Sequence, residues 1–103
     1  MIEPCYVYIM SSASKCLYIG TTRNMIRRWL QHRDGAGSAF CAKYRVRKLV
    51  YVESCDLLVD AFAREKQLKR WRRDRKIALI DSSNPNWRDL AVEWGWHRIP
   101  RSS

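Results

Sequence analysis

The alternation of apolar and polar residues predicts three short strands in the first half of the chain. Residues 5–10 and 16–20 are rich in tyrosine and branched residues, and the segment 11–15 between them is mostly serine. Two such runs joined by a short polar segment are typical of a β-hairpin. Residues 49–53, with the sequence Leu-Val-Tyr-Val-Glu, are the third strand candidate.

Apolar residues at helical spacing predict helices after the hairpin and after the third strand. The first helix is expected over about 22–33, with Thr21, Thr22 or Asn24 as its cap and Gly35 as its stop. Residues 38–44 form a second short helix or a loop. Asp56 is the expected cap of a long helix that ends near residue 71. A further helix over 74–81 ends at the turn signal of residues 82–85.

The resulting order, β-β-α-(α)-β-α-α, predicts a small α+β domain. Three strands with helices gathered around them imply a three-stranded, mainly antiparallel sheet flanked by helices. Residues 1–94 are expected to form a single domain, since the chain of 103 residues shows neither a repeat nor a linker. The stretch 95–103 has no periodicity and is expected to be a flexible C-terminal tail.

The charge of the chain narrows the class of partner. Twenty Lys and Arg residues against ten Asp and Glu residues give a net charge of +10, which attracts polyanions at long range. Nucleic acid is therefore the expected partner. No segment approaches the ~20 apolar residues of a membrane-spanning helix, and the first residues do not resemble a signal peptide. We expect a soluble, cytoplasmic protein.

Four cysteines, at positions 5, 16, 41 and 55, lack the close pairing of zinc or redox motifs. Cys5 and Cys55 lie inside or beside apolar runs, where small reduced cysteines commonly pack. We therefore expect four free thiols.

The tyrosines of the predicted hairpin are the first candidate site residues. If the turn is centred on Ala13, antiparallel pairing places Tyr8 directly opposite Tyr18 on one face of the sheet. One interpretation is a half-buried aromatic pair with a purely structural role. The other is a pair of phenols that belong to a site.

Arg28 and His32 are four residues apart and therefore share one face of the first predicted helix. A solvated arginine and a surface or internally bonded histidine are the structural alternatives. Gly20, at the end of the second strand, would allow a close backbone approach or a sharp turn before the helix.

Glu65 lies within the predicted apolar stripe of the long helix. The stripe is formed by Leu58, Ala61, Phe62 and Leu68. A carboxylate on such a face must be paired, hydrogen-bonded or bound to a cation, because an isolated buried charge is costly. A salt bridge to an arginine is one interpretation, and a hard cation such as Mg²⁺ is the other.

A run of cations follows Glu65. Seven of the eleven residues from 66 to 76 are basic: Lys66, Lys69, Arg70, Arg72, Arg73, Arg75 and Lys76. A solvated helix face is the alternative, but few acids balance this run. We expect it to contact the phosphate backbone of a nucleic acid, a kind of contact that gives affinity without choosing a sequence.

Taken together, these residues resemble the GIY-YIG endonuclease family, whose nuclease domain also occurs in a bacterial excision-repair nuclease. The matching elements are Tyr6-Val7-Tyr8, Tyr18-Ile19-Gly20, Arg28 with His32, and Glu65. The stretches 63–69, 71–73 and 84–87 resemble the small, stand-alone members of this superfamily. The resemblance covers about residues 4–92.

The resemblance implies roles for five residues. Tyr8 and Tyr18 match the tyrosines of the two motifs, and Arg28 matches an arginine that contacts the scissile phosphate. His32 matches a position where relatives carry histidine or tyrosine, and Glu65 matches the metal-binding glutamate. Two positions depart from the pattern, because Tyr6 replaces the glycine of the first motif and Thr21 stands where some relatives have lysine.

Two classes of function follow from the resemblance. The first is a Mg²⁺- or Mn²⁺-dependent endonuclease that hydrolyses phosphodiester bonds of DNA rather than RNA, with branched or damaged DNA as candidate substrates. The second is a non-catalytic nucleic-acid binding module that keeps the nuclease fold. In the first case, Tyr8, assisted by His32 or Tyr18, would orient or deprotonate the attacking water. The nearby metal ion and cationic groups would have to lower its pKa for this.

Overall fold

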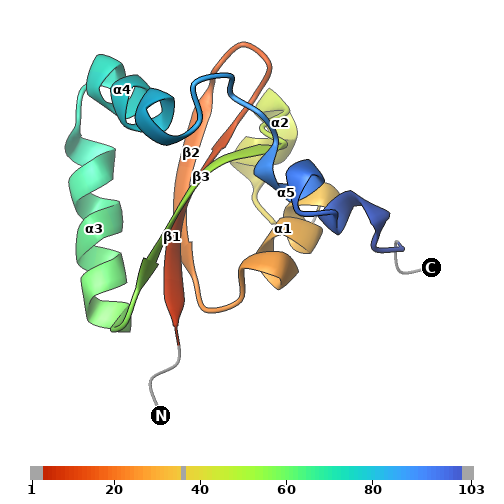
Figure 1. The fold of residues 1–103 in the computed structure, drawn as a ribbon, viewed down its shortest axis with the longest axis horizontal. Coiled ribbons are helices and arrows are strands. Elements are labelled where there is room, and N and C mark those ends of the chain that lie inside the picture. Colours follow the sequence, from red (N-terminus) through yellow and green to blue (C-terminus); the bar gives the residue numbers. More distant parts are fainter. Residues whose placement is uncertain (1–3, 36, 101–103) are drawn as a thin grey trace.

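The computed structural model describes residues 4–35 and 37–100 and has a three-stranded sheet with helices on both faces (Figure 1). The sheet contains β1 (Cys5–Ser11), β2 (Leu17–Thr22) and β3 (Lys48–Cys55), in the order β2-β1-β3. Both neighbours run antiparallel to the central strand β1. The predicted α+β class and the hairpin are therefore confirmed.

Five helices and one 3-10 helix complete the described part of the chain. They are α1 (Met25–Arg33), α2 (Ala39–Tyr44), α3 (Leu58–Arg70), α4 (Arg73–Ser83), α5 (Leu90–Glu93) and η1 (Trp96–Arg98). The Asn24 side chain caps α1 by accepting a hydrogen bond from the Arg27 amide at 3.0 Å, as one of the expected caps. Asp56 does not cap α3, because that helix begins after Leu57 and has no side-chain cap.

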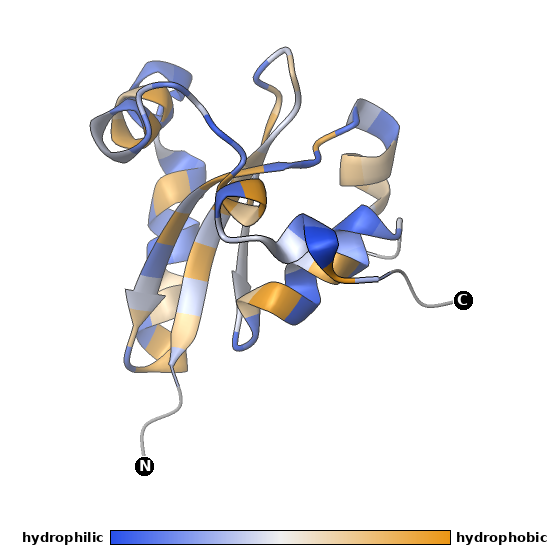
Figure 2. Cartoon of the chain, turned by 45° about the vertical axis from the view of Figure 1, so that its right-hand side comes forward, coloured by the Kyte–Doolittle hydropathy of each residue, from blue (hydrophilic) through white to orange (hydrophobic). Residues whose placement is uncertain are grey.

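The two faces of the sheet have separate cores because successive side chains of β1 point to opposite sides. Val7 and Ile9 pack with Ala61, Leu68 and Ile80, under α3 and α4. On the opposite face, the core contains Tyr8, Met10, Met25, Trp29, Cys41 and Ala91, under α1, α2 and α5. Figure 2 shows hydrophobic segments in the strands, whereas the helices alternate between hydrophobic and hydrophilic residues.

The register of the hairpin differs from the prediction by two residues. Tyr8 lies opposite Gly20, and Tyr18 lies opposite Met10. The turn is centred on Ser14 rather than on Ala13, where the Ser12 hydroxyl accepts a hydrogen bond from the Cys16 amide at 2.9 Å. A displacement of two residues preserves the face of every side chain, so both tyrosines still lie on the same side of the sheet.

Residues after Trp94 are packed against the domain where the structure describes them. The sequence predicted no regular structure here, yet residues 96–98 form η1, and the Trp96 ring lies 6.2 Å from that of Trp29. Arg33 Nη1 also donates a hydrogen bond of 2.6 Å to the carbonyl of Ile99. Aromatic contact and hydrogen bonding therefore hold this segment without any helical periodicity in its sequence. Residues 101–103 of the expected tail lie outside the described residues.

Asn84 attaches the loop after α4 to the sheet. Its buried amide group donates to the carbonyls of Val50 at 3.1 Å and Arg88 at 2.9 Å. Its oxygen accepts from the Arg88 amide at 3.0 Å. Asn84 therefore has a structural role on the α4 side of the sheet.

The four cysteines are free thiols, as expected. Within residues 4–35 and 37–100, no helix has both the length and the apolar character that a membrane span requires.

Candidate active site at the edge strand

Gly20 allows the ring of Tyr8 to lie against the backbone of the edge strand β2. A Cβ atom at Gly20 would be 2.5 Å from the Tyr8 hydroxyl oxygen and 2.6 Å from its Cζ atom, which is far inside van der Waals contact. The glycine of the second tyrosine motif is thus required for space. Its absent side chain lets a tyrosine from the central strand reach across its neighbour.

We expect Gly20→Ala to displace the Tyr8 ring, because an aromatic ring cannot bend away from an added methyl group. Overpacking of this kind costs about 1–3 kcal/mol of the free energy of unfolding, measurable by urea denaturation. The matched control is Gly20→Ala in a Tyr8→Ala background, where the ring is gone and the methyl group has space. An equal cost in both backgrounds would show that the close contact is not responsible.

His32 is the hydrogen-bond partner of Tyr8. The Tyr8 hydroxyl lies 3.2 Å from His32 Nε2, and His32 as a whole residue is only 8% exposed. Its other nitrogen, Nδ1, is buried and has no hydrogen-bond partner among the described residues. A Cβ atom at Gly37 would lie 2.5 Å from Nδ1, so a second glycine makes room for this site.

The protonation states of this pair follow from burial. Desolvation raises the pKa of Tyr8 above its ordinary value of 10.0, and the Tyr18 phenol adds to this effect while Arg28 opposes it. Desolvation also lowers the pKa of His32 below 6.5, with Arg28 as the second cause. At neutral pH the site therefore holds a protonated phenol and a neutral imidazole. Among the protein groups alone, burial outweighs the Arg28 cation, so the pKa of Tyr8 is raised and Arg28 by itself does not lower it.

Tyr18 joins the same aromatic cluster. Its ring centroid lies 6.3 Å from Tyr8, 5.5 Å from His32 and 6.3 Å from Phe40. Phe40 was not among the candidate residues. The sequence signal that could have indicated it is the aromatic pair Phe40 and Tyr44 on the short helix α2, whose rings are 4.8 Å apart.

Arg28 stands at the wall of a basic hollow beside this cluster. The hollow has a volume of about 330 Å³ and is lined by Thr22, Arg23, Asn24, Arg27, Arg28 and Gln31. Because Arg28 influences the pKa values of both Tyr8 and His32, its guanidinium lies within electrostatic reach of both rings. An anionic group bound here would contact Arg28, whose charge acts on both Tyr8 and His32.

Glu65 is half-buried on α3, but its surroundings differ from the predicted apolar stripe. Ala61 and Leu68 are fully buried, whereas Phe62 is 54% exposed and points away from the core. The side chain of Glu65 is 22% exposed and its Oε2 atom is 3.0 Å from Lys69 Nζ. The carboxylate thus has an ion-pair partner, and that partner is a lysine one helical turn away rather than an arginine.

The donor set near Glu65 is suited to a hard cation held mainly by its substrate. The described residues contain no group of three or more His, Cys, Asp or Glu side chains that could bind a metal. A single carboxylate still matches the usual binding of Mg²⁺, which keeps several waters and uses one or two carboxylates plus substrate phosphates. Glu65 is the residue that could hold such an ion.

A groove across β2 connects the tyrosine face with the cationic run. It has a volume of about 310 Å³ and is lined by Leu17, Tyr18, Ile19, Phe40, Lys69 and Lys76. Tyr18 and Phe40 reach it from the α1 and α2 side, whereas the two lysines reach it from α3 and α4. The edge strand therefore lies between the two halves of the candidate site.

The seven cations of residues 66–76 are in different environments. Lys69 and Lys76 line the groove. Arg75 stacks on the Trp71 ring at 3.9 Å from its centroid, and Arg73 Nη2 donates a hydrogen bond of 2.7 Å to the carbonyl of Lys15. The remaining three, Lys66, Arg70 and Arg72, are exposed.

Comparison with known proteins identifies the family of the chain. The model of the GIY-YIG catalytic domain matches residues 4–78. A UPF0213 protein of Syntrophus aciditrophicus is 38% identical over 81 residues, covering 78% of this chain and 92% of the relative. A UPF0213 protein of Pediococcus pentosaceus is 35% identical over 80 residues, covering 78% and 84%.

The fold also has a solved counterpart. The solution NMR structure of a UPF0213 protein from Bacillus halodurans superimposes with a TM-score of 0.55 at 23% identity, covering 84% of this chain and 93% of that one. The matched span contains both tyrosine motifs, Arg28, His32 and Glu65. The chain belongs to the GIY-YIG family, a nuclease superfamily, and is similar to its small UPF0213 members.

Proposed function

We propose that this protein is a metal-dependent endonuclease that hydrolyses phosphodiester bonds in DNA, with branched or damaged DNA as its substrates. The observation that supports this most is the hydrogen-bonded pair Tyr8 and His32 beside Arg28. A protonated phenol, a neutral imidazole and a guanidinium are the groups needed to position water against a phosphate and to accept its proton.

In this proposal Tyr8 and His32 act as a proton relay. The Tyr8 hydroxyl donates to His32 Nε2, and its oxygen accepts a hydrogen bond from the attacking water. As the water oxygen bonds to phosphorus, its proton passes to the Tyr8 oxygen while the Tyr8 proton passes to His32. The bond between phosphorus and the leaving oxygen breaks, and that oxygen takes a proton from solvent.

Arg28 and Glu65 act on the charge of the reacting phosphate. The Arg28 guanidinium neutralises negative charge on the phosphate oxygens that do not react. Glu65 would hold Mg²⁺ or Mn²⁺, whose chemistry when bound is Lewis-acid stabilisation of the leaving oxygen. Lys69, now paired with Glu65, would then be released toward the substrate backbone along the groove with Lys76. Exposed cations of the run, Lys66, Arg70 and Arg72, would extend this backbone contact.

One observation favours a second candidate, a non-catalytic nucleic-acid binding module. The Lys69 ammonium already neutralises the Glu65 carboxylate, so the acid has a structural partner without any metal. Incubating supercoiled and branched DNA with the protein in Mg²⁺, in Mn²⁺ and in EDTA separates the two candidates. Metal-dependent nicking supports the nuclease. Binding without nicking on every substrate supports the module.

We expect the cleavage rate to fall as the pH falls below 6.5, because His32 becomes protonated. Up to pH 10.0 we expect no decrease that is caused by deprotonation of Tyr8. The relay needs His32 neutral, and its pKa is lowered from 6.5. It also needs Tyr8 protonated, and its pKa is raised from 10.0. The measurement is kcat/KM against pH, with the exposed residue His97 replaced by Asn as control. An acid limb with an apparent pKa above 6.5 would contradict these assignments.

The same shift has a consequence for stability. The unfolded chain protonates His32 near 6.5, whereas the folded chain does so at a lower pH. Between these two values the unfolded state binds more protons, so the free energy of unfolding decreases as the pH falls.

A further inference from the structure

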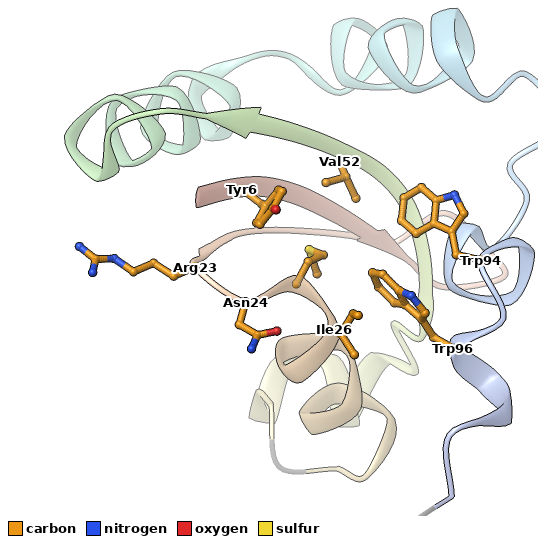
Figure 3. A pocket seen from close by; sticks show the side chains of 8 residues that line it. Tyr6, Arg23, Asn24, Ile26, Val52, Trp94 and Trp96 are labelled. Carbon is orange, nitrogen blue, oxygen red and sulfur yellow. The ribbon is translucent and has the colours of Figure 1, made fainter. Parts of the chain in front are cut away.

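An aromatic hollow of about 290 Å³ lies beside the basic hollow of Arg28. None of the proposed catalytic residues line it. Its lining consists of Tyr6, Arg23, Asn24, Met25, Ile26, Val52, Trp94 and Trp96. In Figure 3 the two tryptophan rings stand on one side of the space and the Tyr6 ring on the other, whereas the Arg23 side chain extends away from the rings.

Large apolar side chains that line the aromatic hollow are exposed to solvent. Trp94 is 49% exposed and Ile26 is 41% exposed, although both line the same concave surface. The Trp94 and Trp96 rings lie 5.1 Å apart, and Trp96 in turn contacts Trp29. Trp94 thus packs on Trp96 on one side, while about half of its surface is exposed to solvent.

The aromatic hollow continues into the basic one. Arg23 and Asn24 line both, and Arg27 and Arg28 complete the basic side. Asn24 and Arg28 are four residues apart at the start of α1, about 6 Å along the helix axis, so the two hollows are direct neighbours. Among the described residues that line either hollow, none is acidic.

We propose that the aromatic hollow binds an unstacked base of a nucleic-acid strand whose neighbouring phosphate lies at Arg27 and Arg28. Every base has an apolar face that stacks on aromatic side chains, and such stacking is tolerant of sequence. Tyr6, the residue that replaces the glycine of the first motif, supplies one wall of the hollow. In this proposal Tyr6, the residue at which the chain departs from its family pattern, contacts the bound base.

The charge of the chain favours this occupant over a second copy of the protein. Two copies would bring together surfaces of a chain with net charge +10, and the adjoining basic hollow is lined by Arg23, Arg27 and Arg28. A nucleic acid brings an apolar base and an adjacent negative charge in one ligand. The proposal rests on the proposed function only in that the ligand is a nucleic acid.

The test measures binding in EDTA, where no metal-dependent cleavage occurs. The probes are a short oligothymidylate and an abasic deoxyribose-phosphate strand of the same length, which share their phosphates and differ in their bases. We expect wild-type protein to bind the base-bearing strand about tenfold more tightly, and Trp94→Ala to lose that difference. Phe62→Ala, which removes a similarly exposed aromatic residue on α3, should keep the difference.

Equal binding of the two probes by wild-type protein would overturn the proposal, and this result does not depend on whether any variant folds. A Trp94→Ala variant that keeps the tenfold difference would also overturn it. So would a concentration-dependent dimer, seen by sedimentation, that Trp94→Ala dissociates. Failure of metal-dependent nicking alone would overturn the proposed nuclease and leave the base site standing.

Discussion

Glu65→Gln is expected to reduce metal-dependent nicking of supercoiled DNA by about 10²–10³-fold. The substitution keeps the size of the side chain but removes the negative charge, so the proposed divalent cation would lose its protein ligand. The measurement is the single-turnover nicking rate in Mg²⁺ and again in Mn²⁺. Stability should change little, because the lost pair with Lys69 is a partly exposed helix contact, worth about 0.3–0.5 kcal/mol.

The control for this result is Glu93→Gln. Glu93 also forms an ion pair, 3.1 Å from Arg88, but it lies on α5, away from α3. If Glu65→Gln nicked DNA as fast as the wild-type protein in both metals, Glu65 would have no metal-binding role. The ion pair with Lys69 would then be its whole function.

Tyr8→Phe is expected to lower the nicking rate by about 10²–10⁴-fold, because it removes the hydroxyl that bonds to His32 and that, in the proposed relay, also bonds to the attacking water. The ring stays in place against Gly20, so the fold should be retained. The loss should appear in kcat with KM nearly unchanged, since the hydroxyl acts on water rather than on the DNA backbone.

Tyr51→Phe provides a matched comparison for this change. Tyr51 also carries a partly buried hydroxyl with a side-chain partner, 2.8 Å from Glu53 Oε2, but that partner lies outside the candidate site. Both variants lose one hydroxyl and keep one ring. A similar loss of rate in the two would mean that Tyr8 acts through stability and not through the relay.

The sequence could predict the elements of the fold because each has a local cause. Tyrosine and branched residues mark the strands, and Asn24 caps α1 where the apolar spacing begins. The hairpin register could not be predicted in the same way, because it depends on how the Ser12 hydroxyl closes the turn. The packing of the residues near Trp96 could not be predicted either, because it depends on a contact with Trp29, which is far away in the chain.

The sequence could predict which residues form the candidate site, but not their pKa values or ion-pair partners. Arg28 and His32 were placed together by helical spacing alone. The pKa of Tyr8 was not predictable, because its burial depends on the close approach to Gly20 and on the rings around it. The ion-pair partner of Glu65 was also missed, since Lys69 was counted with the cations that face nucleic acid.

The edge position of β2 has a mechanical consequence. This strand has a neighbour on one side only, so it is the less restrained partner in the hairpin, yet the groove that contains Tyr18 and Lys69 runs across it. A polyanion lying in that groove would contact helices on both faces of the sheet and would cross the unpaired edge of β2. Bound substrate would act as a clamp on the strand that carries the site.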